Sequence, residues 1–177
     1  MHNSGRVALG GLLCALSAAV MIASLFPAVE YIAPALAGAV LLPLTIEVNK
    51  WWGLGAYAAV ALLVLILPAG LEAKALFIVF FGYYPIIKVW IERLRKVWLR
   101  WAAKLALFNV TMVAAYWVML SFLGLGTDAF EFFGVSLPWV FWAGGNALFV
   151  LYDIALTRVA VLYQCKLHPV FMRIFHG

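Results

Sequence analysis

Long apolar segments alternate with short polar connections along most of the chain. The hydrocarbon core of a bilayer, about 30 Å thick, is spanned by about 20 apolar residues in a helix. The pattern therefore predicts six transmembrane helices, at approximately Val7–Phe26, Ile32–Val48, Trp51–Leu67, Ala75–Trp90, Leu105–Leu123 and Pro138–Tyr163. The second of these contains Pro34 and Pro43. Because proline lacks a backbone donor, we expect a bend or a break near Pro43.

The composition supports a membrane location. Of the 177 residues, 68% are hydrophobic and 11% are charged, against about half and about a quarter in soluble domains. We therefore predict an all-α integral membrane protein with one domain, residues 1–177, and exclude soluble enzymes, nucleic-acid-binding modules and disulfide scaffolds. The first apolar run is longer than the usual 7 to 15 residues of a signal peptide, which predicts a retained helix.

The positions of the basic residues predict the orientation. If the N-terminus is cytoplasmic, Lys74 is the only one of the 12 Lys and Arg residues that falls on the outer side. Four acids fall in the outer loops, namely Glu30, Glu72, Asp128 and Glu131. Cytoplasmic loops of membrane proteins carry an excess of Lys and Arg. We therefore predict a multi-pass protein of the cell membrane with both termini in the cytoplasm.

The longest polar segment is Lys88–Lys104, between the fourth and fifth predicted spans. Its apolar positions, among them Trp90, Trp98 and Trp101, recur at helical spacing, with basic residues on the other face. This predicts a cationic helix in the headgroup plane that contacts anionic lipid of the inner leaflet. The alternative is a docking surface for a partner on the cytoplasmic side.

Small residues recur four apart in the first span, at Gly11, Ala15 and Ala19. A face of this kind allows another helix backbone to approach closely. It is consistent with packing inside the same bundle and equally with docking of a separate subunit, and the spacing does not distinguish the two.

Several ionisable residues fall inside the predicted spans or at their cytoplasmic ends. A charge within a membrane is unfavourable unless it is paired or faces a cavity. Helical rise places four of them at a similar depth, and we interpret them as structural ion pairs: Glu47, Lys88, Asp153 and Arg158. A proton or cation path is the alternative, but the acids do not continue toward the outer side.

Aromatic residues are frequent in the predicted outer half. Trp139, Trp142 and Asn146 are three and four residues apart, so they share one helix face. Indole rings beside an amide would suit a planar, partly polar small molecule. With Tyr31 and Tyr83 they form our candidate substrate-binding set. The alternative is an aromatic belt that faces lipid.

No catalytic motif or nucleotide-binding loop is found, so we expect no enzymatic activity and no ATP hydrolysis by this chain alone. His2, His168 and His176 lie near the termini, and Cys14 and Cys165 form no ligand pattern. We accordingly expect neither a cofactor nor a metal site.

Six short-looped helices with a small-residue first helix resemble the S components, the substrate-binding subunits, of energy-coupling factor (ECF) vitamin transporters. The stretch from Pro34 to Pro43, followed by Gly53 and Gly55, looks like their second and third helices, although Leu42 replaces the usual glycine before the second proline. The resemblance implies that the face with Ala15 and Ala19 docks onto a transmembrane coupling subunit. Two separate ATPase subunits would drive uptake of a small, vitamin-like substrate. The six-helix scaffold protein of the rod-shape elongation machinery is also similar in size and topology, and is the alternative.

Overall fold

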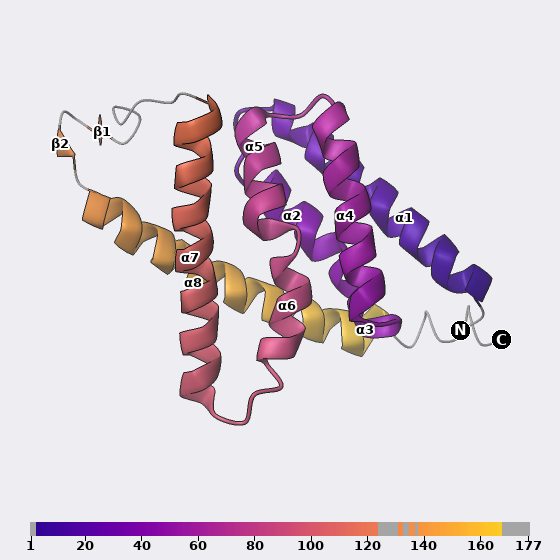
Figure 1. The fold of residues 1–177 in the computed structure, drawn as a ribbon. Coiled ribbons are helices and arrows are strands. Elements are labelled where there is room, and N and C mark those ends of the chain that lie inside the picture. The colour runs from indigo at the N-terminus through magenta and orange to yellow at the C-terminus, as the bar shows by residue number, and fades with distance from the viewer. Residues whose placement is uncertain (1–2, 124–130, 133–134, 137, 168–177) are drawn as a thin grey trace. The chain divides into compact units, whose positions relative to one another are not determined.

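The protein is largely helical (Figure 1). The computed structural model describes residues 3–123, 131–132, 135–136 and 138–167, with side chains for 4–115 and 142–166. The chain forms two compact units, which are described separately below. Unit 1 is Met1–Arg93 with Ala155–Gly177, and unit 2 is Leu94–Ile154. The prediction of a single domain stays a prediction.

Unit 1 consists mainly of the helices before residue 93. Their bounds are α1 (Asn3–Ile22), the 3₁₀ turn η1 (Ala23–Leu25), α2 (Ala33–Val40), α3 (Leu42–Glu47), α4 (Lys50–Ile66), α5 (Leu71–Leu76), the π-helical turn η2 (Phe77–Phe81) and α6 (Tyr84–Ile91). The end of α8 and the π-helical turn η4 (Tyr163–Leu167) belong to the same unit.

Unit 2 contains α7 (Val97–Leu123), most of α8 (Pro138–Leu162) and a pair of two-residue strands. The strands β1 (Glu131–Phe132) and β2 (Val135–Ser136) are antiparallel, with Glu131 opposite Ser136 and Phe132 opposite Val135.

Three helices of the described residues are long and apolar enough to cross a membrane. They are Ser4–Leu25, Leu71–Ile91 and Trp142–Lys166, and two shorter apolar helices cover Ala33–Glu47 and Lys50–Ile66. The chain is therefore a membrane protein with an all-helical framework. Six spans and cytoplasmic termini stay predictions.

The core of unit 1 lies where α1 packs against α2 and α4. Leu9, Leu13 and Met21 of α1 are buried there, together with Val60 and Val64 of α4. Hydrogen bonds also join these helices. The Ser17 hydroxyl donates to the carbonyl oxygen of Ala37 at 2.9 Å. A hydroxyl buried among apolar side chains requires such a partner, and the bond fixes α1 against α2.

The predicted break in the second span is present. Helix α2 ends at Val40 and α3 begins at Leu42, with Pro43 in its first turn. Proline is tolerated there because the first N–H groups of a helix have no intrahelical partner. Helix α4 begins after Asn49, whose side-chain oxygen accepts hydrogen bonds from the backbone N–H groups of Trp51 and Trp52.

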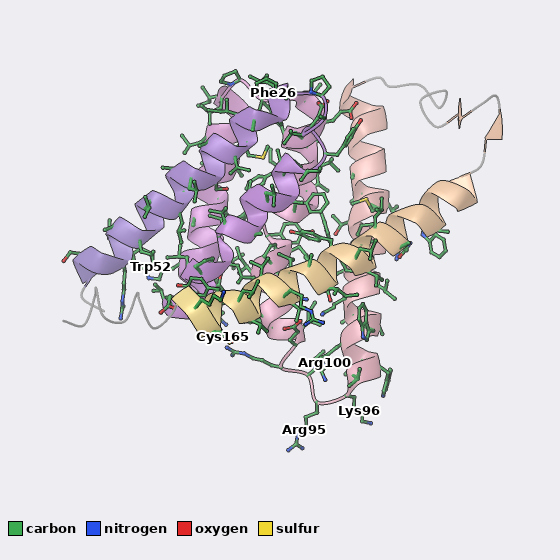
Figure 2. All side chains as sticks on the ribbon, turned by 180° about the vertical axis from the view of Figure 1, so that it is seen from behind. Phe26, Trp52, Arg95, Lys96, Arg100 and Cys165 are labelled. Carbon is green, nitrogen blue, oxygen red and sulfur yellow. The ribbon has the colours of Figure 1, made fainter. Side chains whose placement is uncertain are left out.

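The predicted interfacial helix across Lys88–Lys104 is interrupted. Helix α6 ends at Ile91 and α7 begins at Val97, with a turn between them. Figure 2 shows Arg95, Lys96 and Arg100 around the start of α7. Cations three or four residues apart repel each other on a helix surface, so the dense basic run favours the interruption. Three of the basic residues, Arg93, Arg95 and Lys96, therefore lie in a turn.

Candidate functional site

A polar seam between α7 and the first part of α8 forms the interior of unit 2. The Lys104 ammonium contacts the Asp153 carboxylate at 2.8 Å, with side-chain exposures of 6% and 3%. One turn further, the rings of Phe108 and Phe149 stack with centroids 4.6 Å apart. The two pairs are consistent with one antiparallel register. Phe108 follows Lys104 by four residues on α7, and its partner Phe149 precedes Asp153 by four residues on α8. The seam therefore fixes how the two helices align.

Asn109 is the centre of a second polar cluster in the seam. Its amide nitrogen donates to the side-chain oxygen of Asn146 at 3.0 Å, and its own oxygen accepts the Trp142 indole N–H at 2.6 Å. The Asn146 amide nitrogen donates to the backbone oxygen of Trp142 at 2.9 Å. These bonds give the polar groups partners within the hairpin.

Two predicted substrate-binding residues, Trp142 and Asn146, therefore already have protein partners. The Trp142 side chain is 57% exposed, so its ring still presents a surface. Trp139 lies in α8, but its side chain is outside the described residues. A substrate role for these three residues stays a prediction.

Tyr31 belongs to unit 1 and lies on the segment before α2. Its hydroxyl donates to the Glu72 carboxylate at 2.6 Å. The hydrogen bond to Glu72, followed by the charge of that carboxylate, raises the pKa of Tyr31. Nearby, the Ser24 hydroxyl accepts the backbone N–H of Gly70 at 3.0 Å. These bonds join the region between α1 and α2 to the start of α5.

Tyr83 belongs to an aromatic cluster around η2. Its ring meets those of Tyr57 and Phe80 edge to face, with centroids 5.8 and 6.3 Å apart. The Tyr57 hydroxyl donates to the Ile78 carbonyl oxygen at 2.6 Å. From Glu72 to Tyr83 the helical rise amounts to about 16 Å. The structure therefore does not bring Tyr31 and Tyr83 into one contact.

The four residues predicted as ion pairs have different surroundings. Lys88 is buried and contacts Glu92, four residues later, at 2.9 Å. Asp153 contacts Lys104 as described above. Glu47 accepts a hydrogen bond from the Tyr163 hydroxyl at 3.0 Å. Arg158 is exposed on α8. Lys88 and Asp153 thus each take part in an ion pair, with Glu92 and Lys104 respectively.

The small-residue face of α1 is exposed. Gly11, Ala15 and Ala19 are all exposed, whereas Leu13 and Ser17 on the other side of α1 are buried. A Cβ added to Gly11 would meet no atom within 4 Å. The described residues of unit 1 therefore leave this face of α1 uncovered.

Sequence analysis missed Lys104 as the partner of Asp153 and Asn109 as the partner of Asn146. The members of each pair are 49 and 37 residues apart in the chain. An antiparallel alignment of α7 with α8 that places Lys104 opposite Asp153 would also have brought Asn109 within two positions of Asn146. Within the residues that the structure describes, no group of three His, Cys, Asp or Glu side chains could hold a metal ion.

Comparison of this chain with protein-family models, with curated proteins and with solved structures finds no match.

Proposed function

We propose that this chain is the substrate-capturing membrane subunit of an ECF-type importer. It takes up a small, planar, vitamin-like molecule from the outer side and works with a transmembrane coupling subunit and two ATPase subunits. The observation that carries the proposal is the uncovered face of α1 with Gly11, Ala15 and Ala19.

The chemistry of this face suits contact with another membrane helix. Lipid tails are as apolar as side chains, so helices in a bilayer associate by close packing, and small residues permit it. At 100° per residue, Ala15 and Ala19 lie near the middle of the exposed arc. Larger side chains flank them, with Val7 61% and Leu12 64% exposed. A partner helix would rest on the small residues between these two flanks.

The test replaces both alanines by leucine, Ala15→Leu with Ala19→Leu, and measures co-purification with an ECF coupling complex. Leucine side chains would hold the partner helix away, so we expect at least a tenfold loss of retained complex. Ala58→Leu, at an exposed position of α4, is the matched control and should keep full association. Thermal unfolding in detergent should be unchanged in both variants. Retained association, or unfolding of the double variant alone, would contradict the proposal.

A non-transporting scaffold is the second candidate, and the Asn109 cluster favours it. Trp142 and Asn146 hydrogen-bond within the hairpin, as expected of residues that stabilise the fold. A ligand raises the unfolding temperature of the protein that binds it, so a screen of vitamins and metabolites separates the two functions. An importer subunit should give at least one stabilising ligand, whose effect Trp142→Ala weakens. A scaffold should give none.

A further inference from the structure

A laterally open apolar groove runs along unit 1 and has one charged end. Its walls come from α1, from α2 with α3, and from the end of α8, and its volume is about 720 Å³. Leu16 and Val20 line one wall, Ala39 and Pro43 the second, and Leu162 the third. The break between α2 and α3 lies in the second wall. Each wall runs along the groove for about 10 Å, given a rise of 1.5 Å per residue.

The charged end is at Lys166. It is the one charged side chain among the described residues that line the groove. Glu47, at the end of α3, accepts a hydrogen bond from the Tyr163 hydroxyl at 3.0 Å. The sequence from 154 to 177 contains Arg158, Lys166 and Arg173 but no acid. The groove therefore combines an apolar length with a positively charged end.

Tryptophans indicate the level of this end in the membrane. Within unit 1, Figure 2 places Phe26 at one end, and Trp52 and Cys165 at the other. Trp51 is 67% and Trp52 37% exposed, and exposed tryptophans of membrane helices are enriched at headgroup level. Lys166 follows Cys165 directly in the chain, so its backbone lies at this end of unit 1, at the level where headgroup phosphates are expected.

We propose that the groove binds one anionic glycerophospholipid of the adjoining leaflet, with an acyl chain along the apolar walls and its phosphate at Lys166. Apolar contact alone would not select a lipid, since the surrounding tails offer the same contact. Selectivity comes from the headgroup. Attraction of one Lys to an anionic surface, about 1 kcal/mol, corresponds to about a fivefold preference over a zwitterionic lipid. This site does not depend on the transport proposal.

The test reconstitutes the protein in nanodiscs of equal dioleoyl-phosphatidylglycerol and dioleoyl-phosphatidylcholine. It is then extracted in mild detergent, and the lipids that stay bound are counted by native mass spectrometry. We expect one retained phosphatidylglycerol per wild-type chain. Lys166→Gln should lower the ratio of phosphatidylglycerol to phosphatidylcholine about fivefold. Arg95→Gln removes an exposed cation outside the groove and should leave the ratio unchanged.

A second pair of variants tests the apolar walls. Ala39→Trp should fill the groove and remove the retained lipid, whereas Ala58→Trp, on an exposed face outside the groove, should not. If Ala39→Trp does not fold, Leu36→Trp replaces it as the variant that fills the groove. Leu36 also lines the groove and is 51% exposed. Retention of the lipid by folded groove variants would overturn the proposal. So would a phosphatidylglycerol ratio that falls with Arg95→Gln and not with Lys166→Gln.

Discussion

Removal of Asp153 tests the buried ion pair of the seam. Asp153→Leu leaves the Lys104 ammonium without its carboxylate partner at a site where both side chains are at least 94% buried. Breaking a buried pair by removing one partner costs about 3 to 5 kcal/mol. This corresponds to a fall in the folding equilibrium constant by a factor of about 100 to 4,000. The stacked Phe108 and Phe149 rings lie one turn away along the two helices, so the seam next to this ion pair is apolar.

The double variant Lys104→Met with Asp153→Leu provides the control. It removes both charges and keeps similar volumes, and apolar replacement of a buried pair is often neutral or stabilising. We therefore expect most of the lost stability to return. The assay is unfolding by SDS in mixed micelles, followed by tryptophan fluorescence, with helicity checked by circular dichroism. A cost below about 1 kcal/mol for Asp153→Leu, or a double variant as unstable as the single one, would refute the reasoning.

Three further predictions concern other parts of the chain. Gly38→Ala should destabilise unit 1 by about 1 to 3 kcal/mol in the same assay, because its Cβ would overlap the backbone carbonyl oxygen of Phe81. The hydroxyl of Tyr31 holds its proton more tightly when bonded to Glu72, and its pKa is raised. This bond should therefore contribute stability below pH 10 and lose it at higher pH, so wild type and Tyr31→Phe should differ in stability at neutral pH and converge in alkali. A reporter inserted at Arg95 should give a cytoplasmic signal, and an outer signal would refute the predicted topology.

Local chemistry made part of the fold predictable. The break at Pro43 follows from a missing backbone donor, and the start of α4 follows from the capping side chain of Asn49. Both depend on residues within a few positions of each other. The apolar segments likewise indicated helices, since length and hydropathy are properties of continuous stretches.

The partners of the seam depend on information that no local pattern holds. The sequence predicts an ion pair for Asp153 at its depth in the membrane, but it places Lys104 in an interfacial helix. In the structure the helix is interrupted after Ile91, and α7 begins at Val97. Lys104 therefore lies in the third turn of α7. The sequence pattern groups Asn146 with Trp139 and Trp142 as candidate substrate-binding residues, and it does not indicate that Asn109, 37 residues earlier, is a hydrogen-bond partner of Asn146. Contacts between helices require their register, which the sequence pattern leaves open.

The π-helical turn Phe77–Phe81 affects everything that follows it in its span. Such a turn accommodates one residue more than an α-helix of the same rise, and the Tyr57 hydroxyl bonds to the Ile78 carbonyl within it. Deletion of a single residue there would therefore restore a regular helix and leave α6 facing the same side. A deletion between Tyr84 and Lys88, both buried, would instead rotate the residues after it by about 100° and turn Lys88 away from its neighbours. The π-helical turn is therefore the place in this span where the loss of one residue is best tolerated.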